Sequence, residues 1–375
     1  MTYRTHWIVF AMFLPLFLVT AVVEAQPTRT PTPLPPLVDT PGSTATGISS
    51  GGVVVGASLG FPFTMGPYTM AARAIVWDRR GIPAPLPLLA GDVANTATGI
   101  SANGKNIIGL SFHPGDPGGC PRCDPGGGSG GEMSVTTAVI WGPDGTPAPL
   151  PPLPGDTQSL ANAISPAGVV VGASLAIEFG PPLAVVWDGD GTPTPLPPLP
   201  GDTQSEATAI NPAGVVVGFS AGGGGETAVV WDQNAFRAGI AMPLAPLPDD
   251  TSSRATGISS SGVVVRWSHG SDGSTAVVWD GDGIPTPLPP LVGDRASTAT
   301  GINGDGEVVG NSCPSACLDW DPVSRAAVVW DRDGIPAPLA PLPGGFWSEA
   351  AGINAPGEIV GFSIGSEGFT AVVWR

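Results

Sequence analysis

Tryptophan recurs along the chain at a nearly constant interval, each time at the end of an apolar run such as AVVW. The seven positions are Trp77, Trp141, Trp187, Trp231, Trp279, Trp330 and Trp374. The spacing is about 45 residues with one longer interval, between Trp77 and Trp141, so the chain contains seven copies of one unit and one insertion. A repeat of this length implies that each copy is one supersecondary unit that packs against its neighbours.

Every unit carries the same segments in the same order. In the fourth unit these are EATAI, the turn NPAG, the run VVVGFS, a variable loop, the run AVVW, a further turn and a proline-rich stretch. Four short extended segments at a period of about 40 to 50 residues are the pattern of a β-propeller blade. The sequence therefore predicts an all-β, seven-bladed β-propeller with four strands per blade, formed by residues 26–375 as a single domain.

The composition of each segment suits its predicted place. The innermost strand of a blade lies near a crowded axis, which explains small residues such as Ala45 and Gly47 before the isoleucine of each unit. The valine and tryptophan runs do not alternate, as expected for strands that are buried on both faces. We expect the glycine that ends each NPAG-type turn to be left-handed. These glycines are Gly52, Gly104, Gly168, Gly214, Gly262, Gly306 and Gly357.

The proline-rich stretch, PTPLPPLPGD at Pro193 to Asp202, resembles a ligand of SH3 domains, but its recurrence with the blades favours an outer edge strand. Pro193, Pro195 and Pro197 alternate, so the missing N–H groups all fall on the solvent side and no ladder bond is lost. Pro198 breaks this phase, and we expect strand pairing to stop there. Edge prolines also prevent edge-to-edge aggregation.

The number of segments predicts how the ring closes. The chain ends at Arg375, directly after AVVW, with no proline-rich stretch behind it. PTPLPPL at residues 31–37 has no unit before it. We therefore expect the N-terminal strand to complete the C-terminal blade, whereas an open solenoid would leave both ends uncapped.

The first residues are typical of a secretory signal peptide. A basic start with Arg4 and His6 is followed by an apolar run and by the small-x-small signal that ends at Ala25. Residues 1–25 are thus predicted to be removed, which places the mature protein outside the cell, secreted or at the cell surface, with no stable membrane span. A retained signal anchor is the alternative. The net charge of −17 disfavours nucleic acid and anionic membranes as partners.

The repeat resembles a known family at its best-preserved stretches. Ala299 to Ser312 and Ala350 to Ser363 follow the pattern Ala-x-Gly-Ile-Asn-x-x-Gly-x-Val-Val-Gly-x-Ser, with an Ala-x-x-Trp strand behind each. This resembles the extracellular HAF-repeat family of bacteria over the whole mature chain. The His-Ala-Phe signature is replaced by Thr-Ala-Val, as at Thr227 to Val229. The resemblance implies a secreted repeat protein and transfers no catalytic residue.

The sequence offers little for catalysis, and we expect no enzyme activity and no cofactor. The mature chain has two histidines, His113 and His269, in different units. Ser220 and Ser363 match the letters of a G-x-S-x-G nucleophile elbow, but that elbow requires a strand-to-helix turn. The Asp-x-Asp-Gly stretches, of which Asp188 to Gly191 is one, resemble the start of a calcium loop but favour a hairpin turn.

Four cysteines form two local pairs in variable loops: Cys120 with Cys123 and Cys313 with Cys317. In an exported protein we expect each pair to form a disulfide. Zinc is the alternative, but it would require the two distant loops to meet.

The loops opposite the uniform turns vary between units, and we expect them to carry function. Aromatic residues gather in these loops: Phe61, Phe63, Tyr68, Phe112, Phe179, Trp267, Trp320 and Trp347. They suit a sugar ring or a protein partner, or else they pack the loops. Arg266 replaces a repeat glycine, either as a local adaptation or as drift. The sequence thus predicts a monomeric, non-catalytic binding or structural scaffold. A lectin-like carbohydrate binder and an extracellular hydrolase are the alternatives.

Overall fold

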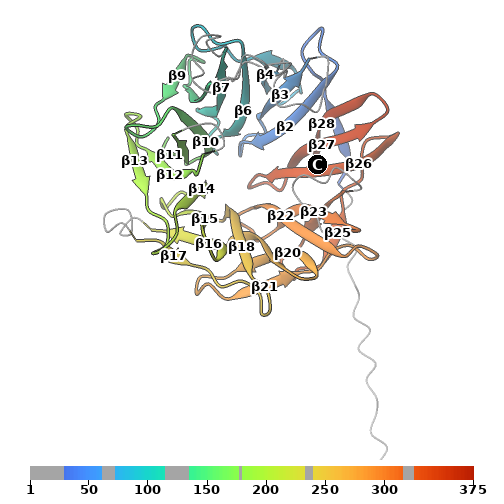
Figure 1. The fold of residues 1–375 in the computed structure, drawn as a ribbon. Coiled ribbons are helices and arrows are strands. Elements are labelled where there is room, and N and C mark those ends of the chain that lie inside the picture. Colours follow the sequence, from blue (N-terminus) through green and yellow to red (C-terminus); the bar gives the residue numbers. More distant parts are fainter. Residues whose placement is uncertain (1–28, 61–71, 115–134, 177–179, 233–239, 316–324) are drawn as a thin grey trace, which may run out of the picture.

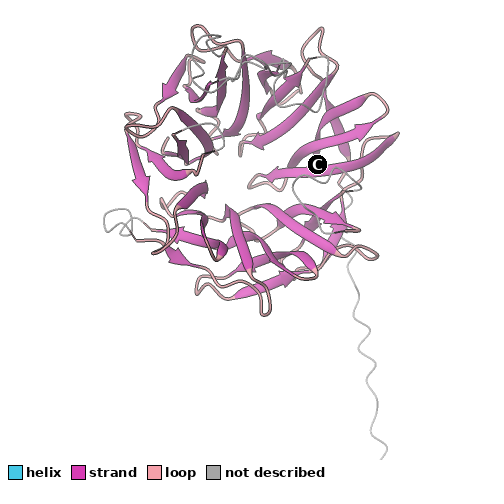
Figure 2. Cartoon of the chain, viewed as in Figure 1, coloured by secondary structure: helices cyan, strands magenta, loops and turns pink. Residues whose placement is uncertain are grey.

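The computed structural model describes residues 29–60, 72–114, 135–176, 180–232, 240–315 and 325–375. These residues form seven four-stranded antiparallel sheets, arranged as blades around a central axis (Figure 1). Within these ranges all regular structure is β (Figure 2), and no helix could cross a membrane. The predicted seven-bladed β-propeller is confirmed. The predicted signal peptide lies outside the described residues.

The strands follow the chain, blade by blade. Blade 1 comprises β2 (Gly42–Ile48), β3 (Val54–Leu59), β4 (Ala72–Trp77) and β5 (Pro83–Pro85). Blade 2 comprises β6 (Ala94–Ile100), β7 (Ile107–His113), β8 (Val135–Trp141) and β9 (Pro147–Leu150). Blade 3 comprises β10 (Gln158–Ile164), β11 (Val170–Leu175), β12 (Leu183–Trp187) and β13 (Pro193–Leu196). Blade 4 comprises β14 (Gln204–Ile210), β15 (Val216–Gly222), β16 (Gly225–Trp231) and β17 (Met242–Pro243).

Blade 5 comprises β18 (Ser252–Ile258), β19 (Val264–Gly270), β20 (Gly273–Trp279) and β21 (Pro285–Leu288). Blade 6 comprises β22 (Ala296–Ile302), β23 (Val308–Cys313), β24 (Ala326–Trp330) and β25 (Pro336–Pro338). Blade 7 comprises β26 (Gly345–Ile353), β27 (Ile359–Gly365), β28 (Gly368–Trp374) and, as its outermost strand, β1 (Pro31–Leu34).

The N-terminal strand closes the ring as predicted. β1 pairs with β28 in antiparallel register, from Pro31 opposite Trp374 to Leu34 opposite Ala371. Two further backbone bonds join Thr30 and Arg375, from each N–H to the other residue's carbonyl, at 2.8 and 3.3 Å. The open solenoid is therefore wrong for this chain.

The innermost strands approach one another as closely as their small residues suggested. A Cβ added to Gly47 would lie 3.3 Å from the Cα of Gly99 in the next blade. All seven innermost strands contain a bulge at this level, for example between Ala45 and Gly47. The predicted turn glycines all have positive φ, from +73° at Gly104 to +90° at Gly262.

The proline strands behave as edge strands. In β13, Pro193 lies opposite Trp187 and Pro195 opposite Val185, and the strand ends at Leu196. Pro193 and Pro195 alternate within the paired strand as predicted, but pairing ends at Leu196, two residues before the predicted end at Pro198.

The carbonyl that follows each proline strand accepts a hydrogen bond from the tryptophan indole of the next blade. Trp231 Nε1 donates to the carbonyl of Pro197 at 2.9 Å. The other six indoles donate to the carbonyls of Pro35, Pro87, Pro151, Ala245, Pro289 and Ala340. The tryptophan and the proline stretch are thus two halves of one contact between blades, which explains why they repeat together.

The core lies between the sheets. Between blades 2 and 3, Ile108 and Leu150 pack with Val170 and Trp187. A buried serine bridges the same interface, because Ser159 Oγ accepts the N–H of Ala138 and donates to the carbonyl of Leu150. Equivalent side chains accept an N–H of the preceding blade at Ser43, Asn95, Ser205, Ser253, Ser297 and Ser348.

Candidate functional site

The two faces of the disc are built differently. We call the turn face the side that carries residues 49–53, residues 78–82 and their equivalents in the other blades. The loop face carries the connections between the second and third strands and the crossings from one blade to the next. The strand registers place the two kinds of connection at opposite ends of every blade, as Val54 opposite Trp77 and Leu59 opposite Ala72 illustrate in blade 1.

The connections between the second and third strands differ in length between blades. In blades 4, 5 and 7 the strands continue to a tight hairpin, closed by the pairs Gly222–Gly225, Gly270–Gly273 and Gly365–Gly368. The second glycine of each pair has φ above +100°. In blades 1, 2, 3 and 6 these connections contain residues that lie outside the described part. The predicted variation between blades is therefore present, but three of the seven connections are short turns.

The structure places only some of the predicted aromatic residues. Phe61, Phe63, Tyr68, Phe179 and Trp320, like Cys120, Cys123 and Cys317, lie outside the described residues. Phe112, Trp267 and Trp347 lie on the loop-face half of blades 2, 5 and 7. These three do not form one site, because they belong to blades that are not neighbours.

An aromatic cluster that the sequence interpretation identified only through Trp347 lies on blade 7. Trp347 pairs with Ile364, and Ile364 pairs with Phe369 across the sheet. The rings of Phe362 and Phe369 are 5.5 Å apart. Phe346 lies at the register shift that precedes Trp347, and it is 68% exposed. We call these five residues the blade 7 cluster.

The blade 7 cluster continues onto blade 1. Phe369 packs against Ala57, Leu59 and Ala72 of that blade. Leu59 and Ala72 flank the connection that contains the predicted residues Phe61, Phe63 and Tyr68. The signal for this cluster in the sequence was GFWSEA, which has two aromatic residues where the other units have none.

Charged residues meet at the loop-face half of the interface between blades 4 and 5. Arg254 donates to Glu226 from Nε at 2.7 Å and from Nη2 at 2.8 Å. The same guanidinium lies 3.9 Å from the centre of the Phe219 ring, which is a cation–π contact. Asn162 of blade 3 donates to Glu206 at 2.9 Å. Burial raises the pKa of Glu206, against the lowering effect of this bond and of Arg254.

Arg266 belongs to the same charged group. In other blades a Cβ at its position would lie about 1.9 Å from an inner-strand carbonyl, as at Gly56 and Gly218, which explains the glycine of the repeat. In blade 5 Arg266 keeps the register of that glycine, opposite Ala255 and Val277. Its charge lowers the pKa of Glu206. The substitution therefore adds a cation beside a partly buried carboxylate, which favours the interpretation as a local adaptation.

The serines of the G-x-S-x-G letters have structural partners. Ser220 is buried, donates to Asp202 at 2.6 Å and accepts the N–H of Leu199. Ser174 and Ser312 make the same bond to Asp156 and Asp294. Ser363 accepts the N–H of Leu342. The serine at this position thus holds the segment of chain that crosses from one blade to the next.

Asp92 lies between a serine and a histidine in blade 2. Ser111 Oγ donates to one carboxylate oxygen, and His113 Nδ1 lies 3.0 Å from the other. The carboxylate therefore separates Ser111 from His113, whereas a nucleophile relay requires the histidine in the middle. His269 lies in blade 5, where its Nδ1 is 3.0 Å from Ser274 Oγ. The structure does not bring the two histidines together.

The Asp-Gly stretches form closed turns. Asp188 Oδ1 accepts the N–H groups of Asp190 and Thr192, both at 3.0 Å, and Gly191 has a φ of +75°. The turns at Asp280 and Asp331 have the same bonds. Within the described ranges, no three side chains suited to a metal ion lie together.

Cys313 is buried at the end of β23. Its predicted partner lies outside the described residues, as do both cysteines of the other pair, so the two disulfides stay predictions.

Comparisons with known proteins find the same fold in solved structures but show no family for this chain. No protein-family profile matches the sequence, and no curated protein matches it. Among solved structures, virginiamycin B lyase from Staphylococcus aureus is 12% identical, with a TM-score of 0.53, over 92% of this chain and 99% of that one. A chain of a mitotic checkpoint complex is 13% identical, with a TM-score of 0.52, over 100% and 99%.

Pyrococcus horikoshii acylaminoacyl peptidase is 12% identical, with a TM-score of 0.51, over 86% of this chain and 50% of that one. Lyases, peptidases and an assembly component share this ring at such identities, so the likeness shows the propeller fold alone.

Proposed function

We propose that this protein is an exported, non-catalytic propeller of the HAF-repeat type, which binds a protein or carbohydrate partner through its loop face. The observation that carries the proposal is the blade 7 cluster. Phe346 is 68% exposed and stands next to a partly buried Trp347. An exposed aromatic side chain on a rigid strand is a typical anchor for a sugar ring or for a protein surface.

The repeated serine and aspartate residues bond to one another within the framework, which supports the non-catalytic part of the proposal. Ser111 and Ser220 are held by Asp92 and Asp202 within the framework between blades. Export is supported by the signal peptide that the sequence predicts at residues 1–25. The intact mass of the exported protein tests it, because cleavage after Ala25 leaves Gln26 as the first residue.

The binding test compares two equivalent positions. Phe346 and Val93 both precede the bridging Ser or Asn of the innermost strand by two residues, and both are exposed, at 68% and 60%. Phe346→Ser should weaken binding by about 2 kcal/mol if this ring is a hot spot. Val93→Ser is the matched control and should leave binding unchanged.

A glycan array and a pull-down from the culture medium separate a carbohydrate ligand from a protein ligand. Equal binding by wild type, Phe346→Ser and Val93→Ser would contradict a site on blade 7. Turnover of ester, peptide or glycoside substrates by the purified protein would contradict the non-catalytic assignment.

A further inference from the structure

Exposed isoleucines form an arc along the outer rim of the turn face, on three consecutive blades. Ile240, Ile284 and Ile335 occupy equivalent positions in blades 4, 5 and 6. Ile284 and Ile335 directly precede β21 and β25, and Ile240 lies two residues before β17. Ile240, Ile284 and Ile335 are 55%, 59% and 49% exposed, and the nearby Met242 of blade 4 is 43% exposed. We call these four residues the isoleucine arc. Aliphatic exposure that recurs on adjacent units is typical of a surface that contacts another molecule.

The arc is a property of these blades and not of the fold. The equivalent residue is threonine in blades 2, 3 and 7, namely Thr146, Thr192 and Thr30. Blade 1 has Ile82, which is 56% exposed but stands alone, because both of its neighbouring blades carry threonine. Threonine is therefore compatible with the position, and Ile82 provides an isolated copy of the same side chain.

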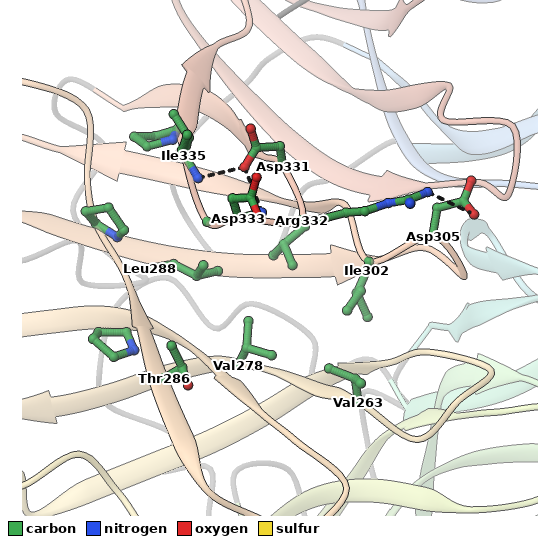
Figure 3. A pocket seen from close by; sticks show the side chains of 16 residues that line it. Val263, Val278, Thr286, Leu288, Ile302, Asp305, Asp331, Arg332, Asp333 and Ile335 are labelled. Atoms are coloured by element: carbon green, nitrogen blue, oxygen red, sulfur yellow. Dashed lines mark hydrogen bonds and ion pairs between the residues drawn. The ribbon is translucent and has the colours of Figure 1, made fainter. Parts of the chain in front are cut away.

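A groove opens beside the arc between blades 5 and 6. Its volume is about 710 Å³. Val263, Val278, Leu288, Ile302 and Ile335 are among the residues that line it (Figure 3). The lining is mainly aliphatic, so the groove suits an aliphatic side chain and not a polar head group.

Acidic residues rim this groove. Asp305, Asp331 and Asp333 lie at its edge (Figure 3). Arg332 lies with them and forms an ion pair with Asp305 at 3.4 Å, so the rim keeps a net negative charge. The neighbouring turn of blade 5 adds two exposed carboxylates, Asp280 and Asp282.

The outer edge strand of blade 5 offers hydrogen-bond acceptors but few hydrogen-bond donors. Pro285 and Pro287 lie opposite Trp279 and Val277, at positions whose carbonyls point away from the sheet while no N–H exists. A partner that approaches this edge meets carbonyl and carboxylate oxygens, and must therefore bring donors.

An equivalent groove between blades 7 and 1 has a different character. It is smaller, about 400 Å³, and it is lined by Arg79, Arg375 and Glu358 together with turn residues such as Gly51. Arg79 is the counterpart of Arg332, but Glu358 stands where the other groove has Val263, and Arg375 stands where blade 5 has the carboxylate of Asp280. The two grooves occupy equivalent places between blades but differ in volume and in lining, so we expect them to take different occupants.

We propose that the isoleucine arc and the groove between blades 5 and 6 form a docking surface for an extended segment of a partner protein, with aliphatic side chains flanked by lysine or arginine. The aliphatic side chains fill the groove and cover the arc, and the basic groups pair with the acidic rim. A nucleic acid or an anionic membrane meets like charge here. A second copy of this chain would bring its own carboxylates. The surface lies opposite the loop face and is independent of the function proposed above.

The test uses three labelled synthetic peptides and fluorescence anisotropy. One peptide alternates leucine with lysine, one alternates leucine with glutamate, and one alternates serine with lysine. The wild-type protein should bind the leucine–lysine peptide at least tenfold more tightly than either of the others. The double variant Ile284→Thr/Ile335→Thr should lose that tenfold preference, whereas Ile82→Thr should keep it. Unchanged thermal midpoints establish that the variants fold.

The contribution of the acidic rim is tested with the same peptides. Asp282→Asn/Asp333→Asn should weaken binding of the leucine–lysine peptide severalfold and reduce its dependence on salt. Equal binding of leucine–lysine and serine–lysine peptides, or equal binding by wild type and the isoleucine double variant, would overturn the proposal. So would a dimer of the wild-type protein in sedimentation that the double variant abolishes, because a second copy would then cover the arc. Phe346→Ser should leave peptide binding unchanged; its loss in that variant would place the peptide on the loop face.

Discussion

Blade 7 is assembled differently from the other six blades. In blades 1 to 6 the four strands follow one another along the chain, and β12 and β13, for example, are joined by the turn at residues 188–192. In blade 7 the outer pair, β28 and β1, comes from opposite ends of the described chain and is held by backbone hydrogen bonds from Pro31 to Leu34. In blades 1 to 6 a short connection brings the two outer strands together. In blade 7 these strands are distant in the sequence, so their pairing has a larger cost in loop-closure entropy.

Side chains on the turn face add contacts at this closure. Arg29, just before β1, donates to Glu307 of blade 6 at 2.6 Å. Arg375, after β28, donates to Glu358 at 2.6 Å. The bond from Asn354 to the carbonyl of Ser49 in blade 1, at 3.0 Å, has an equivalent between blades 4 and 5, from Asn211 to Ser259 at 3.4 Å. The pair Arg332–Asp305 within blade 6, by contrast, is 70% and 65% exposed at its two side chains. The closure is therefore supported by better-buried polar contacts than an ordinary turn.

Deletion of residues 26–40 should cause the largest loss of stability, because it removes the strand that closes blade 7. It removes β1, leaves the edge of β28 unpaired, and deprives Trp77 of its acceptor Pro35 and Ser43 of its acceptor Leu34. An apolar strand with a free edge promotes association between molecules. Thermal unfolding and light scattering should show a lower midpoint and aggregation.

Deletion of residues 26–28 alone is the control, because it stops before Arg29. If the longer deletion left both the midpoint and the scattering unchanged, β1 would not close the ring in solution.

Two glutamates should respond to pH in opposite directions, one at the closure and one within the ring. Burial alone would raise the pKa of Glu358, but hydrogen bonds from Arg375 and Asn354 and the charge of Arg79 bring it below its ordinary value of 4.5. Its stabilisation is therefore present above pH 4.5 and is lost as the pH falls through the folded-state pKa. Glu358→Gln should destabilise the protein at pH 7 by about 0.5 to 1.5 kcal/mol, and less in acid.

Glu206 should behave in the reverse sense. Burial between blades 4 and 5 raises its pKa above 4.5, despite Asn162, Arg254 and Arg266. Its contribution is fully present below pH 4.5 and is lost as the pH rises through the folded-state pKa. Glu206→Gln should therefore stabilise the protein at pH 7, and the gain should vanish in acid. Denaturation midpoints at pH 7 and pH 4 measure both variants; a loss of stability in Glu206→Gln at pH 7 would contradict this assignment.

The framework of the ring could be predicted because its requirements are local. A buried tryptophan, a left-handed glycine and a proline on an edge each follow from one segment of about five residues, and the sevenfold repeat makes each signal unmistakable. Closure followed from an unmatched proline stretch at one end of the chain and its absence at the other. These features depend on the order of segments and not on distances between blades.

The contacts between blades could not be predicted in the same way. The separation between an indole and its carbonyl ranges from 34 residues at Trp231 to 54 at Trp141, because it includes the variable loops. Arg254 and Glu226 are 28 residues apart and in different blades. The exposure of Phe346 could not be predicted, because it depends on a register shift at the start of β26. Each of these features depends on the alignment of neighbouring strands or sheets. The sequence of a single repeat unit does not determine that alignment.

The smallest expected effect concerns a hydroxyl that blade 7 lacks. Around the axis, Thr46, Thr98, Thr208, Thr256 and Thr300, together with Asn162, each donate to an alanine carbonyl of the next blade. The seventh position is Ala351, which faces blade 1 without a donor. Ala351→Thr should supply a bond to the carbonyl of Ala45 and stabilise the protein by about 0.5 to 1 kcal/mol. Ala351→Val has the same shape as threonine but no hydroxyl, so its denaturation midpoint isolates the bond. If valine stabilised the protein as much as threonine, the gain would come from packing, and the missing hydroxyl would not distinguish blade 7 from the rest of the ring.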